Sequence, residues 1–143
     1  MEPAIHLAPR AEHNGFASML ATLVRQNIDE RPEKKHTLLK MRGRVALVVV
    51  DLEMTVTLHF EGGRLTVHDG VVGIPDLTIR ADSEWHTQMS LVEIHGRTGL
   101  PDPRGEVMKS ILTASRSGAI EMFGMWRSFP LALRLTQVLS VSA

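Results

Sequence analysis

The sequence predicts an α+β fold of two layers, in which helices cover one face of a mostly antiparallel, five-stranded sheet. Residues 44–80 place apolar side chains at alternate positions, which is the period of strands. The flanking segments repeat apolar residues every three or four positions, which is the period of helices. Glycine-containing turns join the strands closely, so neighbouring strands run antiparallel. One sheet face is polar, and helices must therefore cover the other.

Two helices are expected before the sheet. Asn14 is a favourable N-cap, and the apolar residues behind it follow at helical spacing: Phe16, Leu20, Leu23, Val24 and Ile28. Pro32 suits the first turn of a second, shorter helix that Gly43 ends. Residues 1–13 contain two prolines and no periodicity, so we expect a flexible N-terminal arm in front of a single domain over residues 14–143.

The sheet is expected to centre on a hairpin at Gly62-Gly63. A mostly apolar, β-branched stretch, 45–52, predicts a central strand, and 54–61 alternates apolar with polar residues up to the turn. The return strand is 64–69. A tight turn predicts the apolar cross-strand pairs Phe60–Leu65 and Leu58–Val67, with His59 opposite Thr66 and Thr57 opposite His68 on the polar face.

The rest of the chain predicts two more strands and three more helices. Leu77 and Ile79 mark a strand, and 119–125 marks the fifth. The first of these helices is expected after Asp82 or Ser83, with Trp85, Met89 and Val92 on its apolar face. A loop over 96–103 precedes the second, which starts after Asp102-Pro103 and carries Val107, Ile111, Leu112 and Ala114. The third begins at Pro130 and carries Leu131, Leu135, Val138 and Leu139.

Composition excludes several classes of protein. The 143 residues include no cysteine, which excludes disulfides, thiolate nucleophiles, iron–sulfur clusters and cysteine-based zinc sites. Sixteen basic and sixteen acidic residues balance, which argues against a nucleic-acid partner. The longest apolar run, 45–50, is far below the ~20 residues of a membrane span, and residues 1–10 lack a signal peptide. We expect a cytoplasmic protein without a cofactor.

No pattern predicts a catalytic or metal site. His59 and His68 would lie diagonally on the polar face of the hairpin, but Asp69 would point to the other face, so a solvated pair is the better interpretation. The chain has no Gly-x-Ser-x-Gly elbow, and its paired glycines do not precede a helix with phosphate-binding spacing.

Two blocks of sequence resemble the sterol carrier protein 2 family of lipid-binding domains. One is the hairpin Val56–Val67 with its sequel Pro75-Asp76-Leu77-Thr78-Ile79-Arg80-Ala81-Asp82. The other is Gly118-Ala119-Ile120-Glu121-Met122-Phe123-Gly124 followed by Leu131–Leu135. With the leading helix, the resemblance covers about residues 14–139. The sequence departs from the family in two places. Segment 93–117 is longer than the usual connection, and segment 125–130 lacks an acidic residue that is often found there.

The resemblance implies a non-catalytic protein that binds or transfers a lipid or another long apolar molecule in a tunnel between sheet and helices. Methionines support such a pocket, because their flexible side chains repack around varied apolar partners. The residues expected to line it are Leu58, Phe60, Leu65, Trp85, Met89, Met122, Trp126, Phe129 and Leu133, with Trp126 and Phe129 near the opening.

Other interpretations of the same residues stay open at this point. Each apolar residue alone is better explained by a closed core. The segment 126–139, in which Arg127 and Arg134 flank apolar residues, also suits transient membrane contact. An accessory role beside a partner enzyme, or a homodimer that buries the apolar surface, are the rivals to a lipid or fatty-acid carrier.

Overall fold

Six strands form one mixed sheet in the order β1-β4-β3-β2-β5-β6. The computed structural model describes residues 3–90 and 104–141. The strands are β1 (Ala4–Leu7), β2 (Arg42–Val49), β3 (Met54–Glu61), β4 (Arg64–Asp69), β5 (Leu77–Ala81) and β6 (Glu121–Phe123). The pairs β2–β3, β3–β4 and β5–β6 are antiparallel, whereas β1–β4 and β2–β5 are parallel. The fold is therefore α+β, as predicted, with six strands in place of the expected five.

The predicted hairpin register is confirmed. Phe60 pairs with Leu65, Leu58 with Val67, His59 with Thr66 and Thr57 with His68. Strand alternation then sends the first two pairs into the core and the last two to the opposite face. A register shift of one residue would exchange these faces, so the buried apolar set specifies the pairing.

Three boundaries differ from the prediction. Residues 1–13 were expected to have no regular structure, but β1 pairs with β4, and Pro9–His13 forms a 3-10 helix that buries Ala11. The central strand is Arg42–Val49 and not 45–52, because its pairing with β3 begins opposite Glu61. The last strand is shorter than the expected 119–125, since only residues 121–123 pair with β5.

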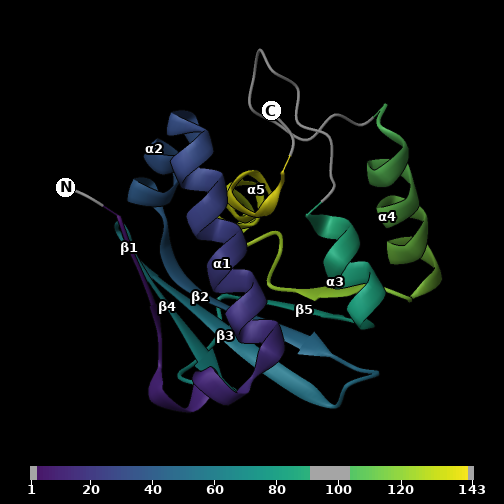
Figure 1. Cartoon of the computed structure of the whole chain (residues 1–143). Coiled ribbons are helices and arrows are strands. Elements are labelled where there is room, and N and C mark those ends of the chain that lie inside the picture. Colours follow the sequence, from purple (N-terminus) through teal and green to yellow (C-terminus); the bar gives the residue numbers. More distant parts are fainter. Residues whose placement is uncertain (1–2, 91–103, 142–143) are drawn as a thin grey trace.

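The helices lie on one face of the sheet (Figure 1). They are α1 (Gly15–Glu30), α2 (Pro32–Lys40), α3 (Ser83–Met89), α4 (Glu106–Ser117) and α5 (Phe129–Leu139). Asn14 caps α1 as predicted, because its side-chain oxygen accepts a hydrogen bond from the Ala17 amide at 3.1 Å. Val92, the loop 96–103 and the Asp102-Pro103 start of the fourth helix lie outside the described residues.

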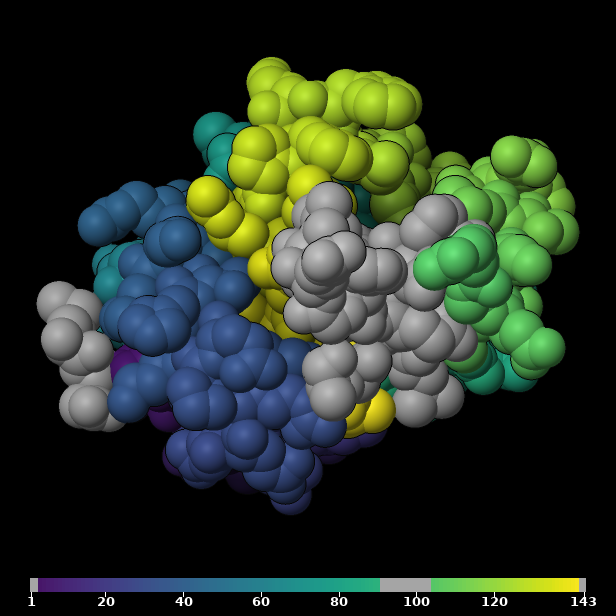
Figure 2. Space-filling view, turned by 90° about the horizontal axis from the view of Figure 1, so that it is seen from above, coloured from purple at the N-terminus to yellow at the C-terminus, as the bar shows by residue number. Residues whose placement is uncertain are grey.

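The apolar core lies between the helices and the inner face of the sheet. Its fully buried side chains include Leu58, Phe60 and Leu65 from the hairpin. Helix α1 packs on β4 and β1, and α3 and α4 lie toward the β5–β6 side of the sheet (Figure 1). Helix α5 lies between these groups, beside α1 and α2 (Figure 2). The inner face therefore has two halves, which different helices cover.

Candidate functional site

An apolar cavity lies inside the half of the molecule that β5 and β6 form with α3, α4 and α5. Its volume is about 80 Å³. Two strands and three helices contribute to its described lining, which consists of Leu77, Ile79, Met89, Met108, Ile111, Met122, Ala132, Leu135, Thr136 and Leu139. None of these side chains ionises, so the cavity can take only an apolar occupant or the apolar part of a larger one.

Helix α5 turns two small residues toward the cavity, beside Leu135 and Leu139. Ala132 and Thr136 lie one turn apart on α5 and face β5 and β6. The Thr136 hydroxyl donates a hydrogen bond to the Ala132 carbonyl at 3.0 Å, so its polar atom is already satisfied within the helix. Among the described lining residues there is therefore no ionisable side chain and no unpaired hydroxyl.

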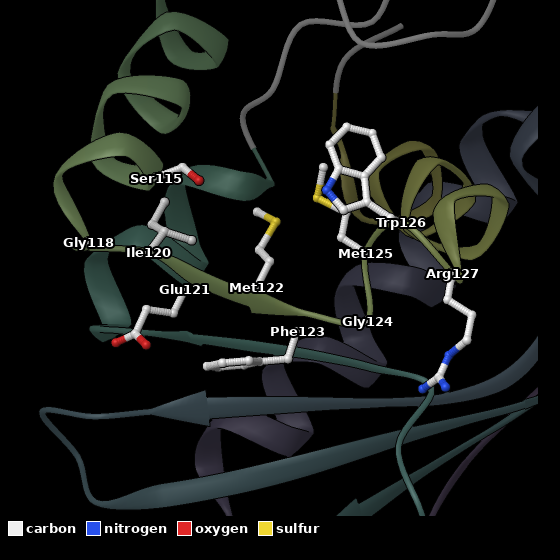
Figure 3. A pocket seen from close by; sticks show the side chains of 10 residues that line it. All are labelled: Ser115, Gly118, Ile120, Glu121, Met122, Phe123, Gly124, Met125, Trp126 and Arg127. Atoms are coloured by element: carbon white, nitrogen blue, oxygen red, sulfur yellow. The ribbon is translucent and has the colours of Figure 1, made fainter.

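An open recess of about 560 Å³ lies beside the cavity, along the outer edge of the sheet (Figure 3). It is lined by Ser115, Gly118, Ile120, Glu121, Met122, Phe123, Gly124, Met125, Trp126 and Arg127. Met122 lines both the recess and the cavity, and it is half-buried. The thioether side chain of Met122 therefore borders both the cavity and the recess.

Gly124 holds the loop that shapes the recess. Its φ of +83° favours glycine, and a Cβ atom there would lie 2.3 Å from the Asp76 carbonyl oxygen. This close approach seats the loop against the start of β5. Two residues later, the chain presents Trp126, whose ring stacks on Phe129 with centroids 6.1 Å apart. Trp126 is 86% exposed, so the stacked pair lies on the surface.

The residues predicted to line the pocket lie in several places. Met89 and Met122 line the cavity, and Trp126 lines the recess with Met122. Trp85 packs against the core, and neither it nor Leu133 belongs to either lining. Phe129 contacts Trp126 outside both. Their contact with a ligand stays a prediction.

The three hairpin residues among the predicted set lie in closed core. Leu58 and Leu65 are 0% exposed and Phe60 is 2% exposed, and none of them borders the cavity or the recess. Alternation on β3 and β4 correctly placed them on the inner face. The alternation contains no information on which helix covers that part of the face. The lining residues on α4 and α5 were missed for the same reason, because the strand pattern does not show which helices lie over β5 and β6.

Two of the three helices that border the cavity, α3 and α5, are anchored by polar contacts. On α3, His86 Nε2 donates to the Val48 carbonyl at 2.9 Å, and Asp51 accepts from the Ser83 amide and hydroxyl at 2.7 and 2.6 Å. Burial lowers the pKa of His86, although its hydrogen bonds and the charges of Asp51 and Asp82 partly oppose this. The Ser83 hydrogen bonds lower the pKa of Asp51. These contacts hold α3 on β2.

On α5, the anchors reach in from the first two helices. Asn27 Nδ2 donates to the Val138 carbonyl at 2.8 Å, and Lys34 Nζ donates to the Ser140 carbonyl. Lys34 is 4% exposed, and burial together with the positive charge of Arg31 lowers its pKa to about 8. Helix α5 is therefore fixed at its C-terminal end, on the side away from the cavity.

No cluster of three or more potential metal ligands occurs among residues 3–90 and 104–141. His59 and His68 lie diagonally on the outer sheet face, as predicted, and burial, the charge of His59 and then that of Arg44 lower the pKa of His68. Within the same residues, no helix has the length and apolar character that crossing a membrane requires.

Solved structures share this fold at low sequence identity. A structure named "UbiJ-SCP2 Ubiquinone synthesis protein" matches with a TM-score of 0.61 and 16% identity, covering 87% of this chain and 92% of that one. A sterol carrier protein 2 crystal structure matches with a TM-score of 0.52 and 17% identity, covering 87% and 96%. No family model and no curated protein sequence matches.

A third match is part of a larger enzyme. The inverting sec-alkylsulfatase Pisa1 from Pseudomonas sp. matches with a TM-score of 0.52 and 18% identity over 76% of this chain, which corresponds to 14% of the sulfatase. The chain therefore has a sterol carrier protein 2-like fold, which confirms the resemblance at the level of fold. The same architecture occurs both as a small separate protein and as a minor part of an enzyme.

Proposed function

We propose that this protein binds a long apolar molecule, a lipid or a fatty-acid-like compound, without catalysing a reaction on it. The ligand tail would occupy the cavity between β5, β6 and the helices α3, α4 and α5, and it would enter from the recess. The observation that carries this proposal is that Met122 lines both spaces. The cytoplasmic location expected from the sequence belongs to the same proposal.

The chemistry of the lining supports an apolar tail. None of the described side chains that line the cavity is ionisable, and the Thr136 hydroxyl is satisfied by the Ala132 carbonyl. A polar ligand would lose its hydration there without gaining hydrogen bonds. An apolar tail has no hydrogen bonds to water that it could lose, and its burial is favourable in proportion to the apolar area that is removed from water.

The size of the cavity requires it to widen when the ligand binds. Its volume of about 80 Å³ is below the roughly 300–1,000 Å³ that encloses a typical small ligand. Met89, Met108 and Met122 border it, and methionine changes rotamer at little cost. A change in the Met122 rotamer would join the cavity to the recess of about 560 Å³. The combined space suits an extended tail.

Mass spectrometry of an organic extract tests the proposal directly. Protein purified without added lipid should release a stoichiometric fatty acid, quinone or isoprenoid. Quinones belong in the panel because one protein with this fold is named for ubiquinone synthesis. A clean extract, together with failure to bind a dansyl-labelled fatty acid, would refute the carrier.

A substitution between cavity and recess tests the entry route. Met122→Trp should close the passage and weaken binding of the labelled fatty acid by about tenfold, because the larger ring occupies the space that the tail needs. Met19→Trp is the matched control, since Met19 is 43% exposed on α1 and borders neither space. Equal affinity in the two variants would place the ligand elsewhere.

An accessory role in a larger assembly is the second candidate function. The observation that favours it is the exposed Trp126–Phe129 stack beside β6, which forms an edge of the sheet. In the sulfatase, a domain with this fold accounts for 14% of the chain. Light scattering over a dilution series tests a homodimer, because a constant monomer mass excludes a stable interface.

A further inference from the structure

The loop between β6 and α5 exposes a stacked aromatic pair to solvent. Trp126 is 86% exposed, Phe129 is 40% exposed, and their rings lie within 19° of parallel. Figure 3 shows the indole ring of Trp126 standing clear of the strand backbone. An indole combines a large apolar surface with one N–H group, and such side chains collect at membrane–water interfaces.

A cationic pocket adjoins this aromatic pair. Its volume is about 410 Å³, and it is lined by Lys40, Arg42, Asp76, Ser128, Pro130, Leu131 and Arg134. Ser128 and Pro130 flank Phe129 in the chain, so the pocket and the aromatic pair meet at the start of α5. Arg127, which is exposed and follows Trp126 in the chain, adds a further cation to this loop, although its side chain points away from the indole ring (Figure 3).

The positive charge here exceeds the nearby negative charge. Within the pocket, Asp76 opposes the cations, and its Oδ2 atom already accepts the Arg44 amide at 2.9 Å. Glu61 pairs with Arg42 across β2 and β3, but its Oε1 atom lies 3.4 Å from His59 Nδ1. The whole chain has no net charge. The cations are therefore concentrated locally and do not reflect a basic protein.

We propose that this surface docks on membranes that contain anionic phospholipid. Trp126 and Phe129 would enter the interface between headgroups and acyl chains. Lys40, Arg42 and Arg134 would receive the phosphate groups. An aromatic pair next to a concentration of cations is the combination that such an interface binds, because apolar burial and attraction to anionic lipid then act together. Docking of this kind needs no ligand in the cavity, so it is independent of the proposed function.

The tryptophans allow a direct test. The chain has two, and Trp85 is half-buried on α3. A Trp85→Phe variant leaves Trp126 as the only fluorescent indole. With vesicles of phosphatidylcholine and phosphatidylglycerol in a 7:3 ratio, its emission should shift to the blue and be quenched by brominated acyl chains. With pure phosphatidylcholine, or in high salt, the shift should be much smaller.

A charge-matched pair of variants tests the pocket. Arg42→Gln with Arg134→Gln should weaken binding to the anionic vesicles at least tenfold. Lys109→Gln with Arg116→Gln removes the same charge from exposed positions on α4 and should change binding less than twofold. Equal losses, or an unshifted Trp126 emission, would overturn the proposal; the latter would favour a protein partner for the aromatic pair. If the Arg42 variant does not fold, the salt dependence and bromine quenching decide.

Discussion

The two halves of the inner sheet face share one strand pattern but differ in how they are packed. In the closed half, β3 and β4 present Leu58, Phe60 and Leu65, all at most 2% exposed and without a bordering cavity. In the cavity half, β5 and β6 present Leu77, Ile79 and Met122 to a space of about 80 Å³. The strands do not cause this difference, because both halves alternate apolar and polar residues.

The covering helices cause it. Helix α1 buries Phe16, Leu20 and Val24, whose spacing of four residues sets large side chains along one face. Helix α5 turns Ala132 and Thr136 toward β5 and β6, and methionines supply much of the remaining lining. Branched side chains occur in both halves, since Leu77, Ile79, Ile111, Leu135 and Leu139 also line the cavity, but three methionines and two small residues of α5 border the space that remains there. The comparison teaches that the ligand site depends on helix side-chain size.

Truncation in each half should give the largest difference in stability. Phe60→Ala should lower the free energy of unfolding by about 3–5 kcal/mol, because it leaves a void in a closed core. Met122→Ala should cost only about 1 kcal/mol, since Met122 is half-buried and already borders a cavity. Urea denaturation monitored by circular dichroism measures both. Similar costs would mean that the halves are equally well packed.

The sequence predicts the inner and outer faces more reliably than the cavity. Period-two alternation and Gly62-Gly63 determine the hairpin register, which needs only neighbouring residues. Strand β1 was missed because Ala4–Leu7 is short and becomes a strand only by pairing with β4, far along the chain.

The candidate site was predicted only in part for the same reason. Met89 and Met122 border the cavity, but Leu58, Phe60 and Leu65 lie in the closed core, and nothing local in a strand indicates which helix will cover it. Ala132 and Thr136 were not singled out, because a small side chain in a helix carries no signal until its neighbours in space are known.

The anchor of α5 should respond to alkaline pH. Lys34, whose pKa is lowered to about 8 from an ordinary 10.5, loses its proton in the folded protein at a lower pH than in the unfolded chain. Between these values the unfolded chain binds more protons, so the free energy of unfolding should rise with pH, by about 1–3 kcal/mol in all. Denaturation midpoints from pH 7.5 to 10 measure the rise.

Lys34→Met should remove most of that rise, since methionine fills the site without titrating. Lys109→Met, at an exposed position on α4, is the control and should keep the slope of the wild type. If Lys34→Met also keeps it, another group titrates, and the burial of Lys34 does not disfavour its charged form.

The anchor of α3 should respond to acidic pH with a smaller effect. Burial lowers the pKa of His86 from 6.5, so its contribution is complete above pH 7 and is lost as the pH falls through the unfolded value toward the folded one. His86→Gln, which keeps a donor for the Val48 carbonyl, should flatten the profile between pH 7 and 5. His36→Gln, at an exposed position of α2, is the control and should not flatten the profile. Equal profiles for the two variants would contradict the assignment of the acid-dependent loss of stability to His86.

Filling the cavity should have the smallest effect on the free energy of unfolding, and it should raise it. Ala132→Leu adds three carbon atoms beside a void of about 80 Å³, so it should raise the free energy of unfolding by about 0.5–1 kcal/mol. It should also weaken binding of the labelled fatty acid, because the tail loses its space. Ala119→Leu, exposed and outside the cavity lining, should change neither property. If the part of the molecule around the cavity were packed as closely as the closed half, the added carbons would force a strained arrangement. The free energy of unfolding would then fall by about 1–3 kcal/mol. A loss of stability in Ala132→Leu would therefore contradict both the comparison and the ligand site that depends on it.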